Sequence, residues 1–441
     1  MTYEREWLGL RGFGIALLLS FACTTFVAAE NDVVLHRFHL SDGAYPQGTL
    51  IADAQQNLYG VTSYGGNGDC TVYPLLHSGC GTVFELTRSD GGAWQQTILY
   101  EFQGGSDGAF PGAALVFDQA GNLYGTTGGG GLSQACCGTV FELSPPAPPG
   151  GDWSEAILYR FTAYTDGAEP SGRLIFDQAG NLYGTAASGG ETYDCCGTVF
   201  ELSPPATGND WNETTLHIFG SPQGYTDGFS PSAGLTFNKS GALYGTTPSG
   251  GEFGWGTVFQ LSPPRLPGGR WSESLYSFQG GTSDGYEPYG DLILVRGNLI
   301  STTSGGGLYS SGTVFQISSS PAGITESTLY NFQPGYNSDS GLVVDSAFNL
   351  YGTTLVGGDG NCKFDPSCGT VFQLVPPPPG GAWTQNIIYE FQGGSDGGIP
   401  ARSTPLLSGG WLLGVTAEGG GSEACNHDGV DGCGTVFAVR K

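Results

Sequence analysis

Short apolar runs, each bounded by turn-forming residues, recur in a fixed order along the chain. One set comprises an A run at 115–118 (LVFD), a B run at 122–127 (NLYGTT), a C run at 138–143 (GTVFEL) and a D run at 158–161 (LYRF). Each run is rich in β-branched and aromatic residues, which favours strands. The intervening 119–121 (QAG) is typical of a hairpin turn, where glycine tolerates positive φ. Each set therefore predicts four antiparallel strands.

The set of four runs is repeated through the chain. A Gly-Thr-Val-Phe tetrad opens seven C runs, 56 to 65 residues apart, at Gly81, Gly138, Gly197, Gly256, Gly312, Gly369 and Gly434. A supersecondary unit repeated at such a period is typical of solenoids and propellers, in which stacked units bury a continuous core. Four antiparallel strands in each of seven units predict an all-β fold, a seven-bladed β-propeller.

The two ends of the chain carry complementary parts of one unit. Residues 33–38 (VVLHRF) form a D run with no A, B or C run before them, and 406–439 hold A, B and C runs with no D run after them. Pairing of the N-terminal strand with the last C run would complete the seventh blade and remove the free edges of an open sheet. We therefore predict one closed domain over residues 30–441.

Aromatic residues near the D runs are expected to pack rather than to bind a ligand. Five tryptophans precede D runs and should lie between blades: Trp94, Trp153, Trp211, Trp271 and Trp383. His36 and His217 replace the tyrosine of the D run, so packing is also expected there. No histidine lies in a recognisable catalytic motif with serine or cysteine, and the sequence therefore predicts no catalytic residue.

The N-terminus has the features of an export signal. Arg5 and Arg11 precede an apolar run at 12–21, and 27–29 (VAA) supplies the small residues that signal peptidase favours. We expect residues 1–29 to be a signal peptide and the mature protein to be secreted, periplasmic or at the cell surface. No later segment has 18 continuous apolar residues, so no membrane span is expected.

The chain is strongly acidic. Its 14 Lys and Arg residues face 40 Asp and Glu residues, which gives a formal charge of −26. Such a surface repels nucleic-acid phosphates and anionic lipid headgroups, which excludes nucleic acid as a partner. Cations, neutral glycans and proteins remain admissible ligands, and we expect a monomer.

Ten cysteines follow residue 29 and pair by unit in the B-to-C connections. The predicted pairs are Cys70 with Cys80, Cys136 with Cys137, Cys195 with Cys196, Cys362 with Cys368, and Cys425 with Cys433. An even number of cysteines in an exported protein predicts disulfides. Zinc binding by these cysteines is not supported, because the sequence has no CxxC pair and no histidine cluster. The adjacent cysteines allow either strained vicinal bridges or cross-links between neighbouring units, because an ordinary disulfide needs a wider Cα separation.

An aspartate preceded by serine or threonine lies in every D-to-A connection: Asp42, Asp107, Asp166, Asp227, Asp284, Asp339 and Asp396. Six of the seven continue as Asp-Gly-x-x-Pro, and Asp339 departs from this motif. Aspartate before glycine commonly caps its own turn by accepting backbone N–H bonds, which is the interpretation we favour. A ring of carboxylates could instead bind calcium, although no segment matches the twelve-residue calcium loop. The sequence predicts no other metal or cofactor.

These motifs resemble those of the Gloeo/Verruco (GloVer) tandem-repeat family of exported bacterial proteins. The residues that carry the resemblance are the Asn-Leu-Tyr-Gly-Thr-Thr runs, Gly-Thr-Val-Phe-Glu-Leu at Gly81, Gly138 and Gly197, and Ser-Asp-Gly-Ala at Ser41 and Ser106. The resemblance covers residues 33–441. It implies export and a propeller-like repeat fold, but no activity and no catalytic residue.

In a propeller the D-to-A and B-to-C connections emerge on one face, so the aspartate loops and the cysteine-rich loops should lie together. We expect a binding or scaffold protein that presents this face to an extracellular glycan or protein. The candidate contact residues are Asp42, Asp107, Asp166, Asp227, Asp284 and Asp396, with Tyr45, Phe110 and Tyr286 beside them.

The alternative function is that of a secreted polysaccharide hydrolase or lyase acting at the central mouth. Catalysis would need unique polar groups in one sector of the ring. The most divergent segment, 289–345, is not enriched in acids, bases or metal ligands. The pattern therefore favours binding over catalysis.

Overall fold

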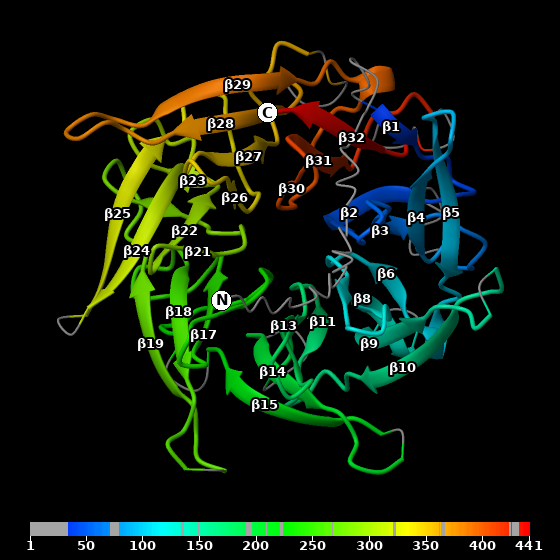
Figure 1. Cartoon of the computed structure of the whole chain (residues 1–441). Coiled ribbons are helices and arrows are strands. Elements are labelled where there is room, and N and C mark those ends of the chain that lie inside the picture. Colours follow the sequence, from blue (N-terminus) through cyan, green and yellow to red (C-terminus); the bar gives the residue numbers. More distant parts are fainter. Residues whose placement is uncertain are drawn as a thin grey trace, which may run out of the picture.

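The computed structural model describes residues 34–441 except 71–78, 134–135, 149, 191–195, 209, 221–223, 267, 321–322, 361, 363–366, 423–424 and 426–431. In this part of the chain, seven antiparallel sheets of four or five strands form a ring around a central axis (Figure 1). The predicted seven-bladed β-propeller is therefore confirmed. The predicted signal peptide, residues 1–29, lies outside the described residues.

The strands of each blade follow one another from the axis outward. Blade 1 consists of β2 (Ala44–Ala52), β3 (Leu58–Tyr64), β4 (Thr82–Arg88) and β5 (Trp94–Glu101). Blade 2 consists of β6 (Ala109–Pro111), β7 (Val116–Phe117), β8 (Leu123–Ser133), β9 (Cys136–Ser144) and β10 (Ser154–Arg160). Blade 3 consists of β11 (Ala168–Pro170), β12 (Ile175–Phe176), β13 (Leu182–Ser188), β14 (Thr198–Ser203) and β15 (Asn212–Ile218). Blade 4 consists of β16 (Thr236–Phe237), β17 (Leu243–Thr247), β18 (Thr257–Ser262) and β19 (Ser272–Ser277).

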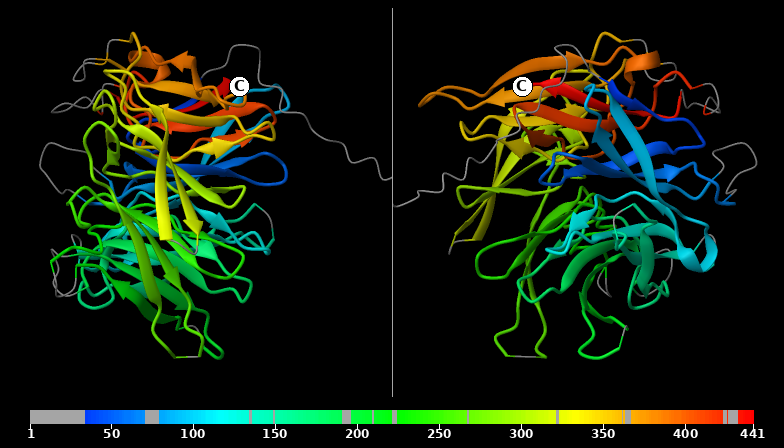
Figure 2. Two further views of the ribbon diagram at one scale, coloured as in Figure 1. Left: turned by 90° about the vertical axis from the view of Figure 1, so that its left-hand side faces the viewer. Right: turned by 45° about the vertical axis from the view of Figure 1, so that its right-hand side comes forward.

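The remaining blades have the same plan. Blade 5 consists of β21 (Ile293–Val295), β22 (Asn298–Thr303), β24 (Thr313–Ser320) and β25 (Gly323–Asn331), beside the short pair β20 (Gly285–Tyr286) and β23 (Gly305–Gly306). Blade 6 consists of β26 (Val343–Val344), β27 (Leu350–Thr354), β28 (Thr370–Val375) and β29 (Thr384–Glu390). Blade 7 consists of β30 (Leu406–Ser408), β31 (Trp411–Thr416), β32 (Thr435–Arg440) and β1 (Val34–Arg37). Several of the hairpins that lead to the outermost strands project from the ring (Figure 2).

Helix is confined, in the described residues, to two single 3-10 turns, η1 (Gly105–Asp107) and η2 (Gly394–Asp396). Both turns lie in D-to-A connections and contain the aspartate of the Asp-Gly motif. No helix in the described part of the chain has the length and apolar character needed to cross a membrane.

The N-terminal strand closes the ring, as predicted. Strand β1 pairs antiparallel with β32, with Val34 opposite Phe437 and Arg37 opposite Thr435. The amide of Phe38 continues this ladder by donating to the carbonyl of Gly434 at 3.0 Å. Figure 1 shows the first strand, in blue, next to the last strand, in red. Blade 7 is therefore built from both ends of the chain.

A phenylalanine at the end of each D strand joins its blade to the next one. Phe161, after β10, packs edge-to-face on Phe200 of β14, with ring centroids 5.1 Å apart and both side chains fully buried. Seven such ring pairs encircle the molecule, and they include Phe38 with Phe84 and Phe391 with Phe437 on either side of the closing blade. Each pair contributes about 0.5–1.5 kcal/mol beyond the burial of its area.

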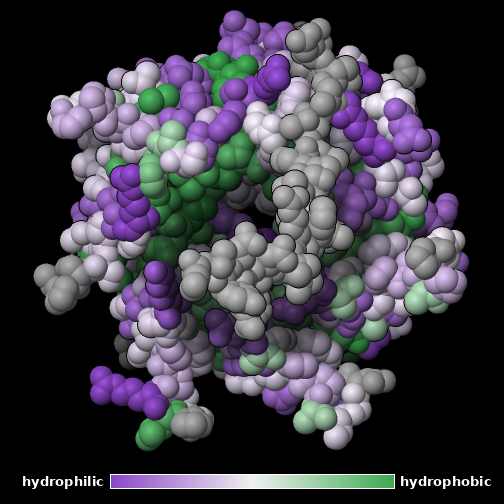
Figure 3. Space-filling view, viewed as in Figure 1, coloured by the Kyte–Doolittle hydropathy of each residue, from purple (hydrophilic) through white to green (hydrophobic). Residues whose placement is uncertain are grey.

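The tryptophans that precede D strands also pack between blades, as predicted. Trp211 of blade 3 contacts Tyr124 of blade 2 with ring centroids 6.5 Å apart. The other four tryptophans lie partly buried against the apolar clusters that join adjacent blades. On the face shown in Figure 3, hydrophilic residues cover most of the rim, and hydrophobic residues gather in places between the blades. The core is therefore distributed around the ring rather than concentrated at its centre.

Candidate functional site

The aspartates of the D-to-A connections are held by the end of the preceding D strand. Asp166 accepts hydrogen bonds from the Thr162 amide at 2.7 Å and from the Tyr159 hydroxyl at 3.0 Å. Burial, followed by the charge of Asp166, raises the pKa of Tyr159. The same pair of donors, a backbone amide and a tyrosine hydroxyl, reaches Asp107, Asp284 and Asp396. These aspartates thus cap their own loops, in the way that the Asp-Gly motif suggests.

A glutamate from the next blade lies beside several of these aspartates. Burial raises the pKa of Glu155 in β10 to about 7, and the nearby charge of Asp107 adds to the effect. Burial likewise raises the pKa values of Glu213 and Glu326 to about 7. Two other D strands have glutamine at this position, Gln96 and Gln385. Several junctions between blades therefore bring together a D-strand ring, a loop aspartate and a residue of the following D strand.

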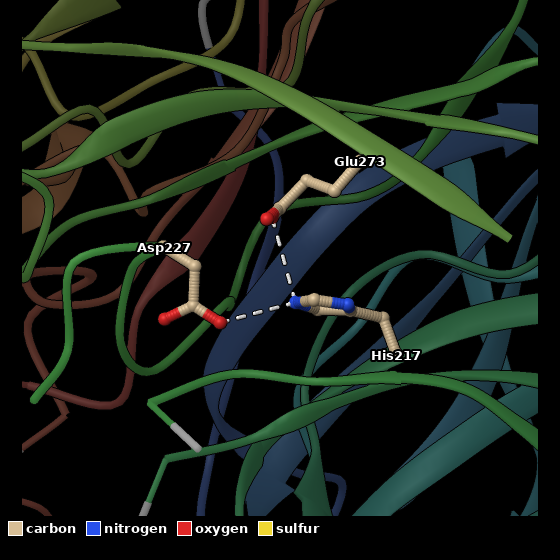
Figure 4. A group of neighbouring side chains, drawn as sticks. All are labelled: His217, Asp227 and Glu273. Carbon is tan, nitrogen blue, oxygen red and sulfur yellow. Dashed lines mark ion pairs between the residues drawn. The ribbon is translucent and has the colours of Figure 1, made fainter. Parts of the chain in front are cut away.

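At the junction of blades 3 and 4, this arrangement brings together three side chains that could hold a metal ion (Figure 4). His217 comes from β15, Asp227 from the connection that follows it, and Glu273 from β19 of the next blade. Nε2 of His217 lies 3.3 Å from Oδ2 of Asp227 and 3.4 Å from Oε1 of Glu273. Burial raises the pKa of Glu273 to about 7, and the charge of His217 opposes that shift. Within the described residues this is the one such group of three.

Asp339, which departs from the Asp-Gly motif, has a different partner. It is buried, and its Oδ2 atom lies 3.0 Å from Nε of Arg402 in the connection that leads into blade 7. The guanidinium of Arg402 also lies over the ring of Tyr289 at 4.5 Å. Tyr330, the D-strand tyrosine of blade 5, donates instead to Gln385 of blade 6 at 3.0 Å. The divergent segment therefore replaces a loop cap with an ion pair between neighbouring blades.

The central mouth of the ring is narrow. Its cavity has a volume of about 60 Å³ and is lined mainly by glycine, alanine, serine and threonine from the inner edges of the blades. The charged groups there are paired, because Nε of Arg173 lies 3.6 Å from Oδ2 of Asp291 and Arg402 pairs with Asp339. Ligand pockets typically have volumes of about 300–1,000 Å³, so this cavity has room only for water-sized groups. A second cavity of about 400 Å³, with Tyr45 and Glu418 in its wall, shares Arg402 with it.

Disulfides fix several B-to-C connections. The structure contains four of the bridges that the cysteine spacing predicts: Cys70–Cys80, Cys136–Cys137, Cys362–Cys368 and Cys425–Cys433. Of the two alternatives for the adjacent cysteines, Cys136 and Cys137 form the vicinal bridge rather than a cross-link between units. The predicted pair of Cys196 involves Cys195, which lies outside the described residues. The cysteine-bearing loops belong to blades 1, 2, 3, 6 and 7.

Blades 4 and 5 have exposed aromatic residues where the other blades have cysteines. Residue 255 is tryptophan at the position directly before the C-run glycine, where five other units have cysteine. Nine large hydrophobic side chains of the described residues are exposed, and seven of them lie in D-to-A or B-to-C connections or, for Leu132, at the end of β8 that leads into one: Leu132, Tyr164, Tyr225, Phe253, Trp255, Leu308 and Tyr309. The exposed hydrophobic residues are thus concentrated on the face that the sequence predicts to be functional.

Aromatic residues recur in the D-to-A and B-to-C connections of blades 4 and 5, and we call Tyr225, Phe253, Trp255, Tyr286 and Tyr309 together the aromatic platform. Trp255 lies against Tyr286 with ring centroids 4.9 Å apart and an angle of 40° between the rings. Phe253 and Trp255 are 48% and 43% exposed, which is unusual for such large apolar side chains. The platform therefore presents flat apolar rings to solvent.

Backbone hydrogen bonds join the loops that carry the platform. The Gly251 amide donates to the carbonyl of Tyr225 at 2.8 Å and connects the D-to-A loop with the B-to-C loop of blade 4. The Gly307 amide donates to the carbonyl of Asp284 at 2.8 Å, which makes the same connection in blade 5. The Glu287 amide donates to the carbonyl of Trp255 at 3.0 Å and links the two blades. These contacts hold the aromatic rings on a fixed backbone.

The structure places the three predicted aromatic contact residues in two groups. Tyr286 belongs to the platform. Tyr45 and Phe110 flank Tyr64 in blades 1 and 2, at centroid distances of 6.0 and 5.4 Å, and are partly buried against it. Sequence reasoning missed the rest of the platform. The signal that could have found it is Trp255, because this tryptophan precedes a C run whereas five others precede D runs.

The fold and the loops together define a β-propeller repeat protein with a rigid loop face. The chain belongs to the Gloeobacter/Verrucomicrobia repeat family, whose sequence profile matches residues 24–236 and 196–437. No curated protein matches the chain. A crystal structure described as that of an unknown-function protein from Dyadobacter fermentans DSM 18053 is 10% identical to it, covers 93% of this chain and 98% of its own, and has a TM-score of 0.44. A similarity at that level carries no argument about function.

Proposed function

We propose that this propeller is an exported binding protein that recognises a neutral glycan with the aromatic platform of blades 4 and 5. The observation that carries the proposal is the exposure of Trp255 and its neighbours on loops that hydrogen bonds hold in place. Aromatic rings supply a large rigid contact area at low cost in conformational entropy, and their flat faces suit the apolar face of a sugar ring. A formal charge of −26 favours a neutral ligand over an anionic one.

The aspartates of the D-to-A connections support this surface rather than contact the ligand. Each carboxylate of Asp107, Asp166, Asp284 and Asp396 is occupied by donors of its own loop. Fixed loops reduce the entropy that a binding surface loses when it is occupied. Export of the protein is part of the proposal and is supported by the export-type N-terminus and by the disulfides.

The alternative, a polysaccharide hydrolase or lyase at the central mouth, has less support. The cavity of about 60 Å³ cannot contain a sugar ring, and its carboxylates are paired with arginines. The neighbouring cavity of about 400 Å³ has one carboxylate, Glu418, among the described residues of its wall, whereas glycoside hydrolysis normally needs two. A protein partner on the platform is the other candidate, and the choice between protein and glycan is an outcome of the experiment below.

A glycan-array screen of the mature protein, followed by calorimetry with the strongest ligand, tests the proposal. Trp255→Ala should weaken binding at least tenfold, because a stacked ring contributes about 1–3 kcal/mol at a binding site. Leu266→Ala is the matched control, since Leu266 is 75% exposed in blade 4 but lies in the C-to-D connection on the opposite face. Unchanged binding by Trp255→Ala, or turnover of a polymer by the wild-type protein, would overturn the proposal.

A further inference from the structure

The junction of blades 3 and 4 has the geometry of the other junctions but a different set of side chains. At four equivalent junctions, a tyrosine hydroxyl donates a hydrogen bond to the loop aspartate, as Tyr159 does to Asp166 at 3.0 Å. His217 takes the place of that tyrosine, and its ring lies edge-on to Phe219 with centroids 4.6 Å apart. The imidazole therefore keeps the position of the tyrosine ring but presents a nitrogen atom to the carboxylate.

Nε2 of His217 faces two carboxylates at once. Its distances of 3.3 Å to Asp227 and 3.4 Å to Glu273 exceed the roughly 2.7–2.9 Å of a charge-assisted N–H···O bond. Nε2 and the Glu273 Oε1 atom are buried, and no hydrogen bond from the described residues satisfies either of them. A single N–H could point to only one of the two oxygens. Two ligand atoms that each lie about 2.0–2.2 Å from one tetrahedral ion are separated by roughly 3.4 Å. The distances from Nε2 to the two carboxylate oxygens match this value, and all three atoms lie within 4.8 Å of one another.

A second histidine–aspartate pair in the chain serves as a comparison for this site. His36 replaces the tyrosine at the junction of blades 7 and 1, and its Nε2 atom lies 3.3 Å from Oδ2 of Asp42. The residue equivalent to Glu273 there is Gln96, whose amide donates to the backbone carbonyl of Asp42 at 2.9 Å. The histidine–aspartate spacing is therefore a property of the repeat. The second carboxylate is what distinguishes the junction of blades 3 and 4.

We propose that His217, Asp227 and Glu273 bind a divalent transition-metal ion of the Zn²⁺ type. One imidazole nitrogen and two carboxylate oxygens form a ligand set that suits such an ion. Calcium takes six to eight oxygen ligands, so an imidazole and only two carboxylates suit it less well. A cavity of about 1,160 Å³ that includes His217 and Trp271 in its wall lies next to this group of side chains.

Such an ion would join two blades. His217 and Asp227 precede blade 4, whereas Glu273 lies in the outermost strand of blade 4, so the ion would connect the outer strands β15 and β19. A ligand that binds the folded state and not the unfolded chain stabilises the fold in proportion to the logarithm of its concentration. The ion is therefore expected to raise the melting temperature, independently of any glycan bound at the aromatic platform.

Calorimetric titration of tag-free, chelator-treated wild-type protein with ZnCl₂ tests the site, together with thermal melts at each Zn²⁺ concentration. The expected result is one saturable site per chain and a melting temperature that rises with Zn²⁺. Two variants should abolish both effects. His217→Tyr introduces the tyrosine that five other junctions have, and Glu273→Gln copies the junction of blades 7 and 1.

His36→Tyr is the matched control, because it removes the other histidine–aspartate pair and should leave the titration unchanged. A cobalt(II) spectrum with tetrahedral d–d bands, lost in Glu273→Gln, would report the geometry without relying on stability. The proposal is overturned if wild-type protein shows no saturable Zn²⁺ binding. It is also overturned if folded His217→Tyr or Glu273→Gln protein binds as the wild type does, or if His36→Tyr loses the site.

Discussion

Pro170 of blade 3 packs directly against Gly138 of blade 2, so that a β-carbon on Gly138 would lie 2.6 Å from its Cδ atom. The same contact joins the C-run glycine of one blade to the Asp-Gly-x-x-Pro proline of the next at five other junctions. The exception is Gly312, because its neighbour is the divergent loop at Asp339, which has no such proline. The two motifs that define the repeat therefore meet across the boundary between blades.

Substitution of Gly138 by alanine should destabilise the protein strongly. The residue has φ 85°, where an L-residue costs about 1–2 kcal/mol, and the clash of the added β-carbon with the Thr127 carbonyl oxygen and with Pro170 adds about 1–3 kcal/mol. Gly121→Ala is the matched control, because Gly121 has φ 89° in the same blade and no atom within 4 Å of its β-carbon position. Denaturant unfolding should show the larger loss for Gly138→Ala. Equal losses would mean that the close packing around Gly138 contributes nothing.

Substitution of Ile324 by tryptophan should stabilise the protein. Ile324 of blade 5 occupies the position where other D strands have tryptophan, and it lines a cavity of about 650 Å³ between blades 4 and 5. Tyr244 and Leu299 line the same cavity, which is bounded mostly by apolar groups. Burying the larger ring there should add about 1–2 kcal/mol to the free energy of unfolding. Trp211→Ile, the reverse change at a filled junction, should lower that free energy, and a gain from it would contradict the account.

The stability of the fold should fall as the pH rises from about 4.5 to about 7. Burial raises the pKa values of Glu155, Glu213 and Glu326 to about 7 from an ordinary value of 4.5. In that interval the unfolded chain releases protons that the folded protein retains, so ionisation opposes folding. Replacing the three glutamates by glutamine, the natural residue at Gln96 and Gln385, should flatten the slope. Melts in chelator-containing buffer measure the slope, and an equal slope in the triple variant would show that these groups do not cause it.

Removal of the Cys362–Cys368 bridge should weaken blade 6 without changing the fold. A closed loop of seven residues restricts the unfolded chain by on the order of 2 kcal/mol. Cys362→Ser/Cys368→Ser protein should lose about this amount in denaturant unfolding. Mass spectrometry of non-reduced peptides from the wild-type protein should find the two cysteines linked, and free thiols at both positions would refute the pairing.

The architecture could be predicted from the sequence because the residues that form each strand are neighbours in the chain and the same pattern of strands recurs in every unit. The seven C-run glycines give the number of blades. The D run at 33–38 and the A, B and C runs at 406–439 each lack the rest of a unit, and together they identify the closing blade. The D-strand histidines were visible for the same reason, but their chemistry was not. His217 and Glu273 lie in different units, 56 residues apart, and only the packing of one outer strand across the next brings them together.

The aromatic platform could not be predicted from the sequence for a similar reason. Trp255 and Tyr286 belong to a B-to-C loop and to the following D-to-A loop, and they meet only because loops of adjacent blades share backbone hydrogen bonds. The ion pair of Asp339 with Arg402 is likewise a contact between units. A repeat pattern predicts what every unit contains, whereas these features arise where one unit departs from the others.

Hydrogen–deuterium exchange of the N-terminal strand tests the closed ring most directly. The amide of Phe38 donates to the carbonyl of Gly434, in the same way that the amide of Phe161 donates to Gly138 inside the chain. Peptides covering β1 should therefore exchange as slowly as those covering β10, because both complete a blade. Exchange of the β1 amides at the rate of an unstructured segment, with β10 still protected, would contradict the closure on which the ring depends.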